Sequence, residues 1–140
     1  MKILLAVDGS EYTRKMLDFV VAHPTLFDPS HGYVVFTAAL ALPPHASSAV
    51  GSQTVKAYHD EESAKVLQPA LATLAATGLS ATTAWRAGPA GETIGEYAEH
   101  GKFDLILMGS HGHGALARMV MGSVANRVLS HCAVPVLLIR

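Results

Sequence analysis

The chain is poor in cysteine. Cys132 is its only one, so the chain cannot form an internal disulfide, and one thiolate cannot build a sulfur-ligated metal site. A single unpaired cysteine is typical of proteins from a reducing compartment. We therefore expect Cys132 to act as a small buried hydrophobic residue and the protein to be cytoplasmic.

Charge is also scarce. Asp, Glu, Lys and Arg make up 15% of the residues, against about 25% in typical soluble domains, which excludes a disordered chain or a coiled coil. The formal net charge of −1 lacks the positive excess of proteins that bind nucleic acid or anionic membranes. No apolar run approaches the ~18 residues that span a bilayer, and Asp8 comes too early for a signal-peptide core. We expect no nucleic-acid partner and no membrane partner.

The length of 140 residues fits one domain of common size, so residues 1–140 are predicted to form a single domain. Residues 43–53, which include Pro43 and Pro44, are predicted to be one long flexible loop. Elsewhere short apolar runs alternate with segments of helical spacing. The predicted strands are 2–7, 33–42, 79–85, 103–108 and 134–139, and the predicted helices are 11–23, 54–77, 89–101 and 123–131.

This alternation predicts an α/β fold. Apolar strands that alternate with helices indicate a mostly parallel sheet with helices on both faces, and right-handed crossovers make it a doubly wound, Rossmann-like fold. Pro135 has no N–H to donate near the start of the last strand. We therefore expect that strand to lie at an edge of the sheet.

A glycine-rich stretch follows the fourth predicted strand. It reads Met108-Gly109-Ser110-His111-Gly112-His113-Gly114, and Gly122-Ser123 then opens the next helix. Glycines allow positive backbone angles and can expose consecutive N–H groups to phosphate oxygens, and a helix N-terminus suits a second anion. The stretch therefore favours a polyphosphate ligand, although a tight turn with close helix–sheet packing explains the same glycines.

Asp8 ends the first predicted strand. If the first and fourth strands are neighbours, Asp8 and Gly109 flank the crevice where ligands bind in open parallel sheets. The Asp8 carboxylate can then accept hydrogen bonds from ribose hydroxyls or hold a phosphate-associated Mg²⁺ ion. The alternative is an aspartate that only forms the Asp8-Gly9-Ser10 turn or caps the helix.

The chain resembles a known family at these positions. The spacing of Gly109, Gly112 and Gly122-Ser123 is similar to the nucleotide-binding motif of the universal stress protein family, in its ATP-binding, single-domain branch. The resemblance extends over nearly the whole chain, since it includes Ile3-Leu4-Leu5-Ala6-Val7-Asp8-Gly9-Ser10, Gly88-Pro89-Ala90, Asp104-Leu105-Ile106-Leu107-Met108-Gly109-Ser110 and Val134-Pro135-Val136-Leu137-Leu138-Ile139.

The resemblance implies a five-stranded parallel sheet of order 3-2-1-4-5, ATP at the point where the winding reverses, and a homodimer through strand 134–139. It implies that Asp8 faces the ribose and phosphates, with Mg²⁺ possible there, and that the backbone near Ala38 meets adenine. That strand ends Phe36-Thr37-Ala38-Ala39-Leu40, where the family often has a histidine, a valine and then polar residues. The implied ribose and phosphate contacts are Gly109, Ser110, Gly112, Gly122, Ser123 and Val124.

Competing motifs are weaker. Residues 112–117 fit the dinucleotide pattern G-x-G-x-x-G/A, but they lie in the fourth strand–helix unit and no Asp or Glu follows residue 104. The lysine-containing phosphate loop and the G-x-S-x-G elbow are missing. His111 and His113 are close in sequence, yet two ligands do not complete a zinc site.

Three functions are consistent with the sequence. The first is a cytoplasmic, dimeric, ATP-binding stress-response or regulatory module without fast turnover and with no catalytic residues, because a base for water and γ-phosphate charges are not evident. The second is a slow ATP hydrolase or an autophosphorylating protein. The third is a dimerising interaction module that binds no nucleotide.

Overall fold

The computed structural model describes residues 1–113 and 121–140. Five strands form one sheet in which every pair is parallel. The strand order is β3-β2-β1-β4-β5, as predicted. The strands are β1 (Lys2–Ala6), β2 (Gly32–Ala39), β3 (Ala81–Ala87), β4 (Leu105–Gly109) and β5 (Val136–Ile139).

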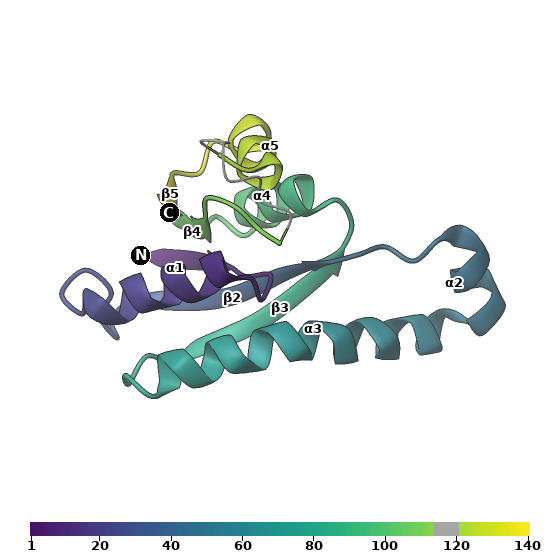
Figure 1. The fold of residues 1–140 in the computed structure, drawn as a ribbon, viewed down its shortest axis with the longest axis horizontal. Helices are drawn as coiled ribbons and strands as arrows, with labels where there is room; N and C mark the ends of the chain where they lie inside the picture. Colours follow the sequence, from purple (N-terminus) through teal and green to yellow (C-terminus); the bar gives the residue numbers. More distant parts are fainter. Residues whose placement is uncertain (114–120) are drawn as a thin grey trace.

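Helices cover both faces of the sheet (Figure 1). On one face lie α1 (Glu11–Ala22) and α3 (Ser52–Ala75), and on the other lie α4 (Ala90–His100) and α5 (Ser123–His131). This arrangement confirms the predicted doubly wound α/β fold. None of the helices in the described residues is both long and apolar enough to span a membrane.

The central strand β1 has no exposed face. Ile3 and Leu5 pack with Met16 of α1, whereas Leu4 packs with Val128 of α5, and all five side chains are fully buried. A strand buried on both faces needs apolar residues at every position rather than at every second one. This explains the uninterrupted apolar run before Asp8.

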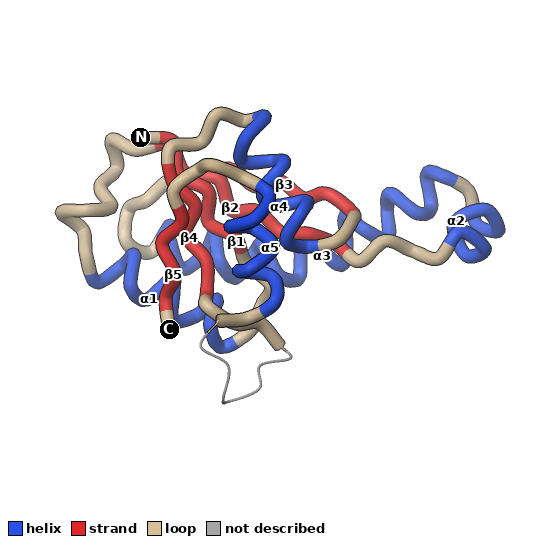
Figure 2. The backbone as a smooth tube through the Cα atoms, turned by 90° about the horizontal axis from the view of Figure 1, so that it is seen from above, coloured by secondary structure: helices blue, strands red, loops and turns tan. Residues whose placement is uncertain are grey.

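The predicted long loop at 43–53 is wrong, because it contains the helix α2 (Pro44–Val50). Pro44 suits a first helical turn, where its missing N–H has no partner to lose. No residue of α2 is buried, so the helix leaves no apolar periodicity in the sequence. Gly51, at φ 81°, separates it from α3. The sequence left open a monomer in which residues 43–53 shield the edge of the last strand. Figure 2 shows α2 at the far end of the molecule from β5, so this segment does not shield that edge.

Strand boundaries also differ from the prediction: the second strand ends at Ala39 rather than at residue 42, and the fourth begins at Leu105 rather than at residue 103. The third strand begins at Ala81, because the N–H of Leu79 donates to the carbonyl of Leu74 at the end of α3. The last strand begins at Val136, and the carbonyl of Pro135 accepts from the N–H of Ile106. The predicted edge position of the last strand is confirmed.

Candidate functional site

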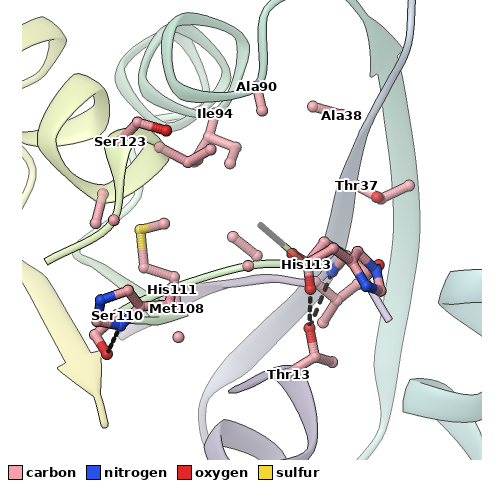
Figure 3. A pocket seen from close by; sticks show the side chains of 18 residues that line it. Thr13, Thr37, Ala38, Ala90, Ile94, Met108, Ser110, His111, His113 and Ser123 are labelled. Atoms are coloured by element: carbon pink, nitrogen blue, oxygen red, sulfur yellow. Dashed lines mark hydrogen bonds between the residues drawn. The ribbon is translucent and has the colours of Figure 1, made fainter. Parts of the chain in front are cut away.

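A pocket of about 250 Å³ lies at the carboxyl ends of β1 and β4 (Figure 3). These two strands are paired in the middle of the sheet, with Ala6 opposite Met108. The winding direction reverses here, since α1 follows β1 on one face and α5 follows β4 on the other. Ligands of open parallel sheets bind at such a point.

All eight site residues predicted from the sequence line this one pocket, together with ten others. The first and fourth strands are neighbours, as the interpretation of Asp8 required. The structure thus brings the predicted residues together, while their contacts with a ligand remain predictions. The eight are Asp8, Ala38, Gly109, Ser110, Gly112, Gly122, Ser123 and Val124.

Asp8 both organises its turn and borders the pocket. Its Oδ1 accepts from the N–H of Ser10 at 2.9 Å and from the hydroxyl of Thr13 at 2.8 Å, and Ser10 caps α1. The Thr13 hydroxyl in turn accepts a hydrogen bond from the Asp8 N–H at 3.0 Å. Dashed lines in Figure 3 mark the hydrogen bonds of the Thr13 hydroxyl. Oδ2 has no hydrogen bond with any residue of 1–113 or 121–140. One oxygen is therefore structural and the other is available.

Glycine is required at Gly109 and Gly112 because other atoms lie too close for a side chain. The prediction that glycines of this region adopt positive backbone angles is wrong for those that the structure describes. Gly109, Gly112 and Gly122 have no positive φ. A Cβ on Gly112 would lie 2.6 Å from Oδ2 of Asp8, and one on Gly109 would lie 2.4 Å from the Cβ of Tyr12. Gly114 lies outside the described residues. A side chain at Gly112 would therefore meet the available oxygen of Asp8.

The N-terminus of α5 opens onto the pocket. Its cap residue is Gly122, which offers no side chain to the first turn, and the Gly122 N–H donates to the carbonyl of Ser110 at 2.7 Å. The N–H groups of Ser123 and Val124 have no partner within the helix, as at any helix start, and both residues line the pocket. These donors and the partial positive charge of the helix end can hold an anion.

Ser110 is a structural junction as well as a lining residue. It is 2% exposed, and its N–H donates to the carbonyl of Ile139 in β5 at 2.8 Å. Its carbonyl accepts from Gly122, and its hydroxyl lies 3.0 Å from Nδ1 of His111. The N–H is therefore not exposed to the pocket, contrary to the predicted row of free donors.

Two histidines line the pocket beside Asp8. Nε2 of His113 lies 2.7 Å from the carbonyl oxygen of Asp8, and the ring of His111 lies 5.1 Å from that of Tyr12. Within residues 1–113 and 121–140 no group of three or more His, Cys, Asp or Glu side chains could hold a metal ion. His113 therefore fastens its segment to the end of β1, and His111 packs against α1; the sequence indicated neither contact.

Arg127, which is near the glycines in the sequence, does not reach the pocket. Arg127 pairs with Glu92 at 3.0 Å and is not among the lining residues. Arg118 lies outside the described residues. No Lys or Arg among the described residues lines the pocket, so within this part of the chain the donors for an anion are backbone N–H groups and imidazoles.

The opposite wall of the pocket is apolar. Ile94 and Ala90 of α4 face Ala38 of β2 across the upper part of the pocket in Figure 3, and Thr37 lies below Ala38. The sequence predicted Ile94 only as a member of the helix 89–101. The position of Ile94 near the start of a helix that follows a strand end could have indicated the wall, because such helix starts lie at the same rim as Asp8.

Sequence relatives cover the whole chain. A universal stress protein of Synechocystis sp. is 32% identical over 140 residues, which cover 99% of this chain and 42% of that protein. One of Bacillus subtilis is 29% identical over 150 residues, covering 99% of this chain and 98% of that protein. The chain thus spans less than half of the first relative and nearly all of the second.

Solved structures share the fold. A universal stress protein from Lactobacillus plantarum has a TM-score of 0.77 at 22% identity, covering 100% of this chain and 97% of that one. One from Archaeoglobus fulgidus in complex with dAMP has a TM-score of 0.67 at 20% identity, covering 100% and 98%. One from Arabidopsis thaliana with AMP bound has a TM-score of 0.62 at 10% identity, covering 99% and 90%.

The comparison with family models completes the assignment. The resemblance seen in the sequence motifs is confirmed by a match along the entire chain, and the observed strand order agrees with it. The model of the universal stress protein family matches residues 1–140, and the chain belongs to that family.

Proposed function

We propose that this chain is a stress-response module that binds an adenine nucleotide, with ATP as the ligand, in the pocket between β1 and β4. The observation that carries the proposal is the meeting of an uncapped helix N-terminus with an available aspartate oxygen at the reversal point of the sheet. The nucleotides in the Archaeoglobus and Arabidopsis structures, dAMP and AMP, support the same ligand class.

The two walls of the pocket suit the two ends of a nucleotide. The apolar surface of Ile94 and Ala38 suits the base, and the start of α5 with Ser123 and Val124 suits phosphates. Asp8 Oδ2 is placed either to accept from a ribose hydroxyl or to hold a phosphate-associated Mg²⁺ ion. A Cβ at Gly112 would occupy space beside that oxygen. The need to keep this space open explains glycine at position 112 without any requirement for a tight turn.

Magnesium fits as an ion carried by the phosphates. Mg²⁺ is commonly held by one or two carboxylates together with substrate phosphates, and Asp8 Oδ2 is one such oxygen. When bound, the ion would neutralise phosphate charge. Its place at Asp8 is part of this proposal.

We propose binding without fast turnover. The described lining residues offer no Lys or Arg for the γ-phosphate, whereas rapid phosphoryl transfer relies on positioned positive charge and a placed nucleophile. The setting is cytoplasmic, and the protein is a homodimer through β5, because this edge strand would otherwise leave backbone groups unpaired.

The decisive experiment is mass analysis of nucleotide released from protein purified without added ATP, followed by calorimetric titration with ATP, AMP and adenosine. We expect saturable binding, with ATP and AMP tighter than adenosine because the start of α5 contacts phosphate. Absence of both co-purified nucleotide and titratable binding would favour the nucleotide-free interaction module. Incubation with labelled ATP and Mg²⁺ tests the hydrolase: turnover near ~1 s⁻¹ would contradict a binding module.

A further inference from the structure

A second cavity, of about 460 Å³, opens between α2, the start of α3 and the end of β3. It shares no lining residue with the first pocket. Three of its lining residues, Ser52, Lys56 and His59, lie about one turn apart along one side of α3, and Trp85 of β3 faces them. The cavity therefore combines an aromatic wall with a row of polar groups.

His59 is the unusual member of this row. It is 5% exposed and lines the cavity, and its ring lies 5.3 Å from that of Trp85. Among the described residues it has ring contacts but no hydrogen bond. The ring nitrogens of His59 are not among the fully buried polar atoms, so a polar group of a ligand in the cavity can reach them.

The start of α3 adds unpaired donors. The helix has no side-chain cap, and its first internal bond runs from the N–H of Val55 to the carbonyl of Gly51 at 3.1 Å. The N–H groups before Val55, including that of Ser52, therefore have no helical partner. A helix of this length carries a partial positive charge at its start, which favours an anion.

Asp60 fixes the two side chains that flank the site. Its Oδ2 accepts from Nζ of Lys56 at 2.6 Å, and its Oδ1 accepts from the indole N–H of Trp85 at 2.8 Å. Lys56 keeps further N–H donors for a ligand, since an ammonium group has three. The hydroxyls of Ser47 and Ser48 donate to carbonyls of their own helix, so donors to an anion come from α3.

We propose that this cavity binds a small aromatic compound carrying a phosphate or carboxylate group. The ring lies against Trp85, and the anionic group lies between the start of α3, Lys56 and His59. An apolar compound would leave the His59 ring without a partner, and an anion without a ring would leave the Trp85 wall uncovered. This site is independent of the pocket proposed for the nucleotide.

Trp85 is the only tryptophan, so the protein has one indole N–H resonance, and that resonance reports on this cavity. We would titrate the protein with phenyl phosphate, benzoate and the neutral analogue benzyl alcohol. We expect a saturable shift with phenyl phosphate or benzoate, whichever headgroup fits, and binding of benzyl alcohol weaker by about tenfold. No saturable shift with either anion, or equal affinity for the alcohol, would overturn the proposal.

Single-residue variants test whether the aromatic anion binds in this cavity. Lys56→Gln and His59→Phe should each weaken binding by about tenfold, while Lys65→Gln is the matched control, since Lys65 pairs with Glu62 on the same helix outside the cavity. Because Lys56 is exposed, its replacement tests the site even if His59→Phe unfolds. Gly112→Ala alters only the first pocket. Unchanged binding in Lys56→Gln, or lost binding in Gly112→Ala, would show that the probe sits elsewhere.

Discussion

Oδ2 of Asp8 lies 2.6 Å from the point that a Cβ on Gly112 would occupy. Gly112→Ala should therefore displace this carboxylate without backbone strain, because Gly112 has no positive φ. We expect calorimetry to show nucleotide affinity reduced by about tenfold, the loss of one charge-assisted hydrogen bond. Gly32→Ala is the control, since a Cβ there meets nothing within 4 Å. Unchanged affinity in Gly112→Ala would remove Asp8 from the site.

Gly109→Ala should act on stability instead. Its Cβ would lie 2.4 Å from the Cβ of Tyr12 and 3.1 Å from that residue's backbone, so α1 or β4 must shift. We expect urea denaturation to show a loss of about 1–3 kcal/mol in the free energy of unfolding. The same Gly32→Ala variant should stay within ~0.5 kcal/mol of the parent. An equally stable Gly109→Ala protein would mean that α1 adjusts at no cost.

Ser123→Ala should weaken nucleotide binding without abolishing it. In the proposed complex the Ser123 hydroxyl supplies one hydrogen bond to a phosphate, worth roughly 1.5 to 3 kcal/mol, while the N–H groups at the start of α5 remain. Calorimetry should therefore show a smaller loss than for Gly112→Ala combined with Gly122→Ala, where a Cβ at residue 122 meets the Ser110 carbonyl at 3.0 Å. A larger loss for Ser123→Ala would assign phosphate recognition to this side chain.

Because β5 is an edge strand with unpaired backbone groups, we expect the protein to form a dimer through it. Light scattering should give about twice the 14.7 kDa chain mass, and Leu138→Asp should give one chain mass. Leu138 also packs against the core beneath α4 and α5, so circular dichroism must show that the variant is folded. Thr83→Asp, on the opposite edge strand β3, is the control. Slow amide exchange along β5 tests the same interface in the unmodified protein, and a monomeric parent would exclude it.

The carboxyl group of Asp60 should have a lowered pKa. Its hydrogen bond from Lys56, then that from Trp85, lowers its pKa below the ordinary 3.8. A lowered pKa means that the contribution to stability is present above pH 3.8 and is lost as the pH falls through the folded-state pKa. The Asp60 carboxyl carbon shift should have a midpoint below 3.8, and Lys56→Gln should raise that midpoint. A midpoint at 3.8 or above would contradict the observed bonds.

The sequence was informative where burial is complete. The apolar run before Asp8 and the stretch up to Met108 predicted two buried strands, because strands buried on both faces are apolar at nearly every position. That the two strands are neighbours, which brings Asp8 and Gly109 to one crevice, was implied by the family resemblance and not by the runs themselves. Residues with helical spacing in α4 and α5 were also predicted from burial, since each helix buries one face.

Other features could not be found from the sequence. The helix α2 buries no residue, so no periodicity marks it. The reason for glycine at 109 and 112 is contact with Tyr12 and Asp8, which are distant in sequence. The grouping of His59 with Trp85 likewise depends on how α3 lies across the sheet, which spacing within one helix does not reveal.

The backbone N–H and carbonyl of Ser110 link β5, the proposed dimer edge, to the start of α5, the proposed phosphate site. Its N–H holds the last residue of β5, and its carbonyl holds the cap of α5. A ligand that shifts the start of α5 must therefore perturb the same residue that anchors the edge strand. Thermodynamic linkage is reciprocal, so nucleotide should change the dimer dissociation constant by the factor by which dimerisation changes nucleotide affinity.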